Sequence, residues 1–234
     1  MKRSFLIFLF LMNLMAWMLP VGAQDPKQVM QQKVAAFQQS IAENQKALRS
    51  YTWTETTQIK LKGEVKSSKI ESCRYGPDGK VQKTLLSDPP AKKEMRGLKK
   101  KIVEKKTEEM KDYMDRVSSL VHRYVPPQGE LIQSAVAQGN LSFSPQGSDA
   151  ILLQFKNYVK TGDLVSITLD TAAKQIRQFK VDTFLDEEKE KVILRVDFEN
   201  LPDGIWYAGT KDLQVAAKEI NVHIIDSNFL KLAM

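Results

Sequence analysis

Between Leu164 and Phe229, apolar and polar residues alternate over five successive short segments. This two-residue period is typical of β-strands that bury one face and expose the other. The segments are separated by turn-forming stretches, such as Asp170-Thr171 and Pro202-Asp203-Gly204, that are too short for a crossover helix. The sequence therefore predicts an antiparallel meander. The apolar positions are Val165, Ile167 and Leu169; Phe179, Val181 and Leu185; Val192, Leu194, Val196 and Phe198; Leu213, Val215 and Ala217; Ile220, Val222 and Ile224.

The alternation slips between Ala217 and Ile220, so we expect a bulge near Lys218-Glu219 that bends the sheet. Together with the strands predicted below, the sheet reaches about ten strands, and a sheet of this size curls. Its apolar face has to be covered either by the chain's own helices or by a bound molecule.

The first 23 residues have the layout of a secretory signal peptide. Met1-Lys2-Arg3 gives a positive start, Phe5 to Leu19 is apolar, and Val21-Gly22-Ala23 places small residues before a cleavage site. The apolar run also approaches the roughly 20 residues of an uncleaved membrane anchor. We expect cleavage after Ala23, which leaves residues 24–234 as a single domain.

The cysteine content and the net charge of the chain indicate its cellular compartment and the partners that it could bind. The chain has one cysteine, Cys73, so it has no internal disulfide; this is ordinary for a bacterial periplasmic domain. The formal charge is +7, and +5 remains once Lys2 and Arg3 leave with the signal peptide. This mild excess permits contact with an anionic surface without requiring it. We expect an exported protein of the periplasm.

Three more strands are predicted after the signal. Tyr51 to Leu61 alternates clearly, and a second strand from Val65 to Tyr75 follows a turn at Gly63-Glu64. A third strand, Lys80 to Leu86, follows Gly76-Pro77-Asp78-Gly79. The second strand is polar on both sides, so we expect it at an edge of the sheet.

The inward face of the Tyr51–Leu61 strand carries Trp53, Ile59 and Leu61 and also one acid, Glu55. Glu55 either orients a ligand's polar head at a cavity or reaches from the strand end to water.

Two helical regions are predicted. Pro26 to Ser50 shows one apolar stripe on a glutamine-rich helix, which we expect to pack on the sheet rather than on a membrane. A helical insertion at about 91–139 opens with a basic run, Lys92 to Lys106, and continues with apolar residues at helical spacing up to Pro126-Pro127. The basic run either touches an anionic membrane surface or forms a solvated helix face with ion pairs. The apolar residues of this helix are Met110, Met114, Val117, Val121 and Tyr124.

A shorter helix is predicted from Glu130 to Gln138, with Leu131, Ala135 and Val136 directed inward. Strands are then predicted at Leu141 to Phe143 and at Ala150 to Tyr158.

Patterns that carry catalysis are missing from the sequence. The two histidines, His122 and His223, have no second ligand at metal spacing, and no Gly-x-Ser-x-Gly elbow, phosphate loop or dinucleotide fingerprint occurs. Lysines and aromatic residues lie on different segments, which argues against nucleic-acid binding. We therefore expect no enzyme activity, no metal, no cofactor and no nucleic-acid partner.

The order of the elements resembles the outer-membrane lipoprotein-sorting family, the LolA-like periplasmic carriers. The resemblance rests on the amphipathic N-terminal helix, the Tyr51-Thr52-Trp53-Thr54 strand, the closing Leu201-Pro202-Asp203-Gly204 with Trp206-Tyr207, and the final strand Ile220 to Ile225. It implies an α+β fold: a curved antiparallel sheet, or incomplete β-barrel, covered by an N-terminal helix and inserted helices. It also implies a concave apolar side that holds acyl chains or another hydrophobic ligand.

We accordingly expect a non-enzymatic carrier for a lipid or lipoprotein acyl chain. The alternative is an envelope protein-interaction or sensor protein that uses the same fold without a ligand. The helix around Met110, Met114 and Val117 is either a lid over the groove or plain core packing. The predicted groove residues are Trp53, Ile59, Leu61, Phe179, Val181, Leu194 and Val196.

Overall fold

The computed structural model describes residues 39–87 and 98–232, and side chains of residues 98–104 are not described. The predicted signal peptide, the first part of the Pro26–Ser50 helix and much of the Lys92–Lys106 run lie outside the described residues.

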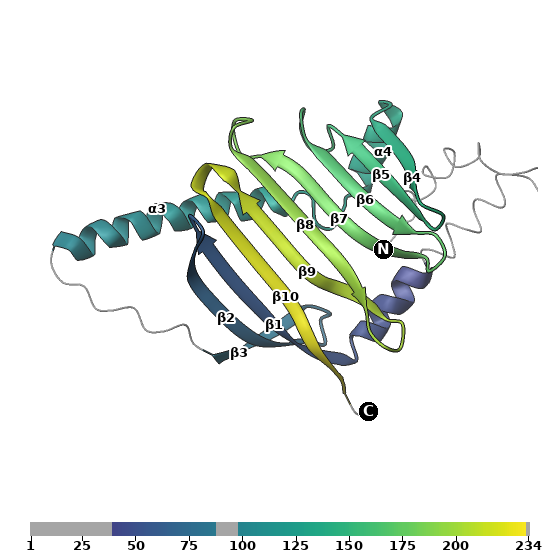
Figure 1. Ribbon diagram of the computed structural model, residues 1–234, viewed down its shortest axis with the longest axis horizontal. Helices are drawn as coiled ribbons and strands as arrows, with labels where there is room; N and C mark the ends of the chain where they lie inside the picture. The colour runs from purple at the N-terminus through teal and green to yellow at the C-terminus, as the bar shows by residue number, and fades with distance from the viewer. Residues whose placement is uncertain (1–38, 88–97, 233–234) are drawn as a thin grey trace, which may run out of the picture.

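Ten strands form one antiparallel sheet that is not closed into a barrel (Figure 1). Their order across the sheet is β3-β2-β1-β10-β9-β8-β7-β6-β5-β4, so the predicted meander is present as β6 to β10. The sheet is twisted and bends at its β1–β3 end (Figure 1). The strands are β1 (Tyr51–Leu61), β2 (Glu64–Tyr75), β3 (Val81–Ser87), β4 (Leu141–Gln146), β5 (Ala150–Lys156), β6 (Leu164–Asp170), β7 (Gln175–Phe184), β8 (Lys191–Asn200), β9 (Trp206–Val215) and β10 (Ile220–Lys231).

β2 is an interior strand, so its predicted edge position is wrong. It pairs with β1 on one side and with β3 on the other. Inward polar residues are tolerated in β2 because they are paired: Glu71 is buried, and its carboxylate lies 2.7 Å from Lys69 Nζ. The edge is β3, whose seven residues are all exposed.

The predicted bulge near Lys218-Glu219 is a turn. β9 ends at Val215, a short 3-10 turn spans Ala216–Lys218, and Glu219 takes a φ of 51° before β10 begins. The alternation slips there because the chain reverses direction.

An extra residue does occur in β10, opposite Trp53. Thr54 pairs with Ser227 but Thr52 pairs with Leu230, and Asn228 adopts a φ of 53° within this irregularity. Asparagine tolerates this left-handed conformation better than most side chains. The irregularity places Phe229 beside Trp53, with the two rings stacked at 5.7 Å.

Two helices lie on one face of the sheet, which we call the helix face (Figure 1). α3 (Leu98–Val121) crosses this face and extends beyond β1 and β2, and α4 (Gly129–Ala137) lies beside β5. In α4, Ile132 and Ala135 are buried, whereas the predicted inward residues Leu131 and Val136 are half-buried. The buried core is Tyr113, Val117, Leu120, Tyr124, Ile132, Ala135, Leu153, Phe155, Tyr158, Val165, Ile167, Phe179, Val181, Val192, Val215 and Ile220.

The end of the N-terminal helix, residues 39–48, is attached to the start of β9 by one side chain. Asn44 is buried; its Nδ2 donates to the Trp206 carbonyl at 2.7 Å, and its Oδ1 accepts from the Trp206 N–H at 2.8 Å. A side-chain amide therefore replaces a strand partner at this point of the sheet.

Asp163 organises the connection between β5 and β6. It is 2% exposed. Its Oδ1 accepts from the Tyr158 N–H at 2.5 Å, and its Oδ2 accepts from the N–H groups of Val159 and Lys160, both at 2.9 Å. The Tyr124 hydroxyl donates to the same Oδ2 at 2.7 Å, which joins this loop to the chain that follows α3.

Candidate ligand-binding face

α3 fills the part of the helix face over β7 and β8. Phe179 and Val181 are 6% and 2% exposed, and they lie directly opposite Val196 and Leu194 on β8. The crevice between helix and sheet here has no room for a water molecule. It is lined by Val121, Tyr124, Val181, Thr183, Val192 and Leu194.

The three residues predicted as a lid differ in burial along α3. Val117 is fully buried in the core, whereas Met114 and Met110, one and two turns earlier, are half-buried against it. The C-terminal half of α3 is therefore part of the core, and its packing loosens toward its N-terminal half.

The remaining predicted groove residues, Trp53, Ile59 and Leu61, lie on β1, which pairs with β10. On the helix face these strands form a ladder of opposed residues, which we call the β1–β10 seam. Ile59 is 37% exposed, and Leu61, Thr57, Val222 and Ile224 are half-buried. The seam pairs are Leu61 with Ile220, Ile59 with Val222, Thr57 with Ile224, and Glu55 with Asp226.

The apolar pairs of the seam end at a buried ionic cluster. Glu55 is 6% exposed and Asp226 8%, and Lys211 Nζ lies 3.4 Å from Glu55 Oε2 and 2.7 Å from Asp226 Oδ2. Lys83, from β3, pairs with Glu55 Oε1. Glu55 thus does not reach water. The sequence pattern singled out Glu55. Asp226 falls on the same face of its strand as Ile220, Val222 and Ile224, but its contact with lysine depends on how the strands pair.

The environment moves the pKa values of the two carboxyl groups in opposite directions. Burial would raise the pKa of Glu55, but Lys83 and Lys211 together hold it below the ordinary value. Burial raises the pKa of Asp226, and Lys211 only partly opposes this. Asp226 is therefore the less well compensated carboxylate.

Two buried polar atoms at this end of the seam have no hydrogen-bond partner among the described residues: Asp226 Oδ1 and Trp53 Nε1. Trp53 stacks on Phe229 and also contacts Tyr75, at 5.4 Å between ring centroids. Tyr207 lies against Phe229 at 4.2 Å. The ionic cluster is thus bordered by an aromatic group from four strands.

Cysteine and histidine side chains are dispersed. Cys73 is fully buried, and burial raises the pKa of its thiol. His223 Nδ1 lies 2.5 Å from Asp212 Oδ1, whereas His122 Nδ1 lies 2.7 Å from the Ser118 carbonyl on α3. Within residues 39–87 and 98–232, no three His, Cys, Asp or Glu side chains are grouped so as to hold a metal ion. No helix in this part of the chain is long and apolar enough to cross a bilayer.

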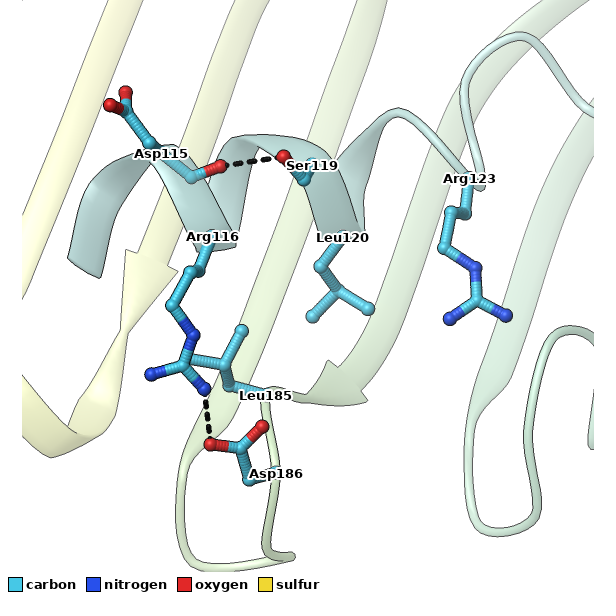
Figure 2. A pocket seen from close by; sticks show the side chains of 7 residues that line it. All are labelled: Asp115, Arg116, Ser119, Leu120, Arg123, Leu185 and Asp186. Atoms are coloured by element: carbon cyan, nitrogen blue, oxygen red, sulfur yellow. Dashed lines mark hydrogen bonds and ion pairs between the residues drawn. The ribbon is translucent and has the colours of Figure 1, made fainter. Parts of the chain in front are cut away.

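A hollow of about 430 Å³ lies elsewhere, between the C-terminal end of α3 and the loop after β7. Figure 2 shows Arg116 reaching across it to Asp186, and Ser119 donating to the Asp115 carbonyl. Arg123 also lines the hollow, which is open to solvent and has four charged side chains in its lining. This lining does not suit an acyl chain, and the sequence pattern did not single out this group.

Tyrosine ionisation gives a test of this packing. All six tyrosines have pKa values above that of a free phenol, and burial is the main cause for all but Tyr51, where the bond to Asp203 dominates. The pKa of Tyr158 rises to about 12. The neutral phenol is favoured by folding, so its contribution is full below pH 10 and is lost as pH rises toward 12. For Tyr158 this amounts to about 2 kcal/mol.

We expect phenolate absorbance and circular dichroism to change together above pH 10, in one step. The urea-unfolded protein is the control and should titrate near pH 10. A tyrosine that ionises at pH 10 in the folded protein would contradict the burial described above.

The similarity of this chain to known proteins is remote. No family model and no curated protein sequence matches the chain. Among solved structures, a DUF1329 family protein from Desulfovibrio piger is 12% identical, with a TM-score of 0.37 over 84% of this chain and 92% of that chain.

A LolA superfamily protein from Nitrosomonas europaea is 10% identical, with a TM-score of 0.37 over 84% of this chain and 93% of that one. A structure described as an outer membrane lipoprotein-sorting protein domain, from Vibrio parahaemolyticus, is 13% identical, with a TM-score of 0.35 over 82% and 90%. These similarities are remote, so the function has to be inferred from the chain's own residues.

Proposed function

We propose that the protein is an exported, periplasmic, non-enzymatic carrier that binds a hydrophobic ligand, such as a lipid or lipoprotein acyl chain, along the β1–β10 seam. The observation that supports this most is the strip of apolar side chains Leu61, Ile59, Val222 and Ile224, which are half-buried or exposed beside the buried core under α3. From Leu61 to Glu55 the strip measures about 20 Å, at about 3.3 Å per residue. An extended acyl chain fits this shape.

In this proposal, the N-terminal half of α3 is the lid. Met110 and Met114 are flexible side chains that adapt to a variable apolar surface. Val117 anchors the lid, because it is fully buried in the core. Of the predicted groove residues, Trp53, Ile59 and Leu61 contact the ligand. Phe179, Val181, Leu194 and Val196 support the helix that borders the site.

We further propose that the basic run from Lys92 to Lys106 makes transient contact with an anionic membrane surface. Lys105 and Lys106 are exposed on α3, in the half that extends past β1 and β2 (Figure 1). A positive segment next to the lid would bring the open end of the seam to lipid.

The carrier proposal is tested with a fluorescent acyl probe. Ile59→Lys places a charge in the apolar strip and should weaken probe binding at least tenfold. Ile225→Lys is the matched control, since Ile225 is 39% exposed, lies on the adjacent strand and belongs to the opposite face by alternation. The Ile225→Lys variant should bind the acyl probe with the same affinity as the parent protein.

Two outcomes would count against the carrier. The first is a parent protein that binds no acyl probe and carries no lipid when purified from its host. The second is equal weakening by both lysine variants. Delivery of the probe from vesicles tests the membrane contact, because transfer from anionic vesicles should be faster than from neutral ones and should slow with added salt.

One observation favours the alternative of an envelope interaction protein. Among the described residues, β3 is an edge strand with Val81, Leu85 and Leu86 at 40%, 45% and 59% exposure, whereas the other edge strand, β4, contains Pro145. An exposed apolar edge is a site for strand addition by another chain. Absence of bound lipid together with partner capture that is lost in Leu85→Lys would support this alternative.

A further inference from the structure

We propose that the Glu55–Asp226 end of the β1–β10 seam binds the polar head of the ligand and selects an uncharged head that both donates and accepts a hydrogen bond, such as a hydroxyl or a primary amide. This inference rests on the proposed carrier function. It adds the chemical class of the ligand's head group.

The two unpaired atoms define what the site lacks. Trp53 Nε1 can only donate a hydrogen bond, and the ionised Asp226 Oδ1 can only accept one. Both residues are more than nine-tenths buried, and they occupy successive levels of the same seam. A buried polar atom without a partner is costly, so a group that satisfies both atoms gains on binding.

The charges already present exclude a charged head. Three buried carboxylates, Glu55, Asp226 and Glu71, are matched by three ammonium groups: Lys83 and Lys211 pair with the first two, and Lys69 pairs with Glu71, which lies opposite Glu55 on β2. A further charge would be buried without a counter-ion. A carboxylate head would accept from Trp53 but repel Asp226, whereas an ammonium head would face Lys211 and leave the Trp53 N–H unused. A hydroxyl or a primary amide can both accept a hydrogen bond from the Trp53 N–H and donate one to the Asp226 carboxylate.

The residues around the cluster shield the ligand's head from water, and the seam leads the ligand's tail up to it. Tyr75 and Tyr207 belong to the aromatic group that borders the cluster, and burial is the main cause of the raised pKa of each. Their rings contact Trp53 and Phe229. The cluster follows directly after the Thr57–Ile224 pair, so a tail on the apolar pairs places its head against Asp226. Hydrogen bonds in such low-dielectric surroundings are strengthened.

The test uses four ligands that share one twelve-carbon chain: dodecanol, dodecanamide, dodecanoate and dodecylamine. Each competes with the fluorescent acyl probe at neutral pH. The alcohol and the amide should bind about tenfold more tightly than the carboxylate and the amine, the size of effect expected for one or two buried hydrogen bonds.

Two variants assign the preference to the named atoms. Trp53→Phe keeps a ring for stacking on Phe229 but removes the N–H, and Asp226→Asn replaces the carboxylate by an amide. Each should reduce the alcohol's advantage over dodecanoate by about tenfold. Tyr113→Phe is the matched control, because Tyr113 carries the third unpaired buried polar atom and belongs to α3, in the core. It should leave the preference unchanged.

The outcomes separate the two proposals. Failure of all four ligands and the probe to bind the folded parent protein overturns the carrier itself. Equal binding of the four, a preference for either charged ligand, or an equal loss of all four in Trp53→Phe overturns the head-group inference while the carrier stands. The unpaired atoms would then hold a water molecule only.

Discussion

Replacing Asp163 by alanine is expected to lower the free energy of unfolding by about 4 kcal/mol. The substitution leaves three backbone N–H groups of the β5–β6 connection and the Tyr124 hydroxyl without their acceptor. These groups lie in a part of the loop that is shielded from water, since Asp163 is 2% exposed. The midpoint of urea unfolding, followed by circular dichroism, measures the change.

Two variants calibrate the loss at Asp163. Tyr124→Phe removes one bond of the network and should cost about 1 kcal/mol, and Asp163→Asn keeps one acceptor oxygen and should fall between the two. A destabilisation in Asp163→Ala no larger than that of Tyr124→Phe would show that the carboxylate does not hold the loop together.

Replacing Val117 by aspartate should lower the free energy of unfolding by about as much as Asp163→Ala. Val117→Asp buries a carboxylate, without a partner, between α3 and the sheet, at a cost of about 4 kcal/mol. Because Val117 belongs to the same core cluster as Val181 and Val215, we expect the whole chain to lose stability in a single transition. Near- and far-ultraviolet circular dichroism should fall at the same urea concentration.

Ser118→Asp is the control for this experiment, because Ser118 is the next residue of α3 and is exposed. It should change stability by less than about 1 kcal/mol. If Val117→Asp instead released α3 while the sheet stayed folded, the entire helix would be a detachable lid, and the anchor assigned to Val117 would be wrong.

Local patterns in the sequence were sufficient for most of the elements. The alternation from Leu164 onward predicted β6 to β10, and Tyr51 to Leu61 matches β1 residue for residue. The turn at Ala216–Lys218 looked like a bulge because a reversal and an inserted residue both shift the parity of the pattern. The order of the strands in the sheet could not be predicted from local patterns, which is why β2 was expected at the edge.

Some residues of the candidate site could also be predicted from local patterns, and others could not. Trp53, Ile59 and Leu61 follow from the period of one strand, and Glu55 stands out as an acid within it. Their partners could not be found by period: Asp226, Lys83 and Lys211 lie on three other strands, and only pairing brings them to Glu55. Which apolar residues remain open to a ligand depends on where α3 crosses the sheet, and nothing in the periodicity of either element specifies that crossing.

The sequence by itself determined an antiparallel, one-sided sheet with amphipathic helices, because side-chain alternation and turn chemistry are local properties of the chain. Only the tertiary structure decided that α3 fills the β7–β8 part of the helix face and leaves the β1–β10 seam half-open. It also decided that two carboxylates and two lysines meet at the end of that seam. Both depend on contacts between residues far apart in the chain, which are set by how the whole sheet pairs and packs.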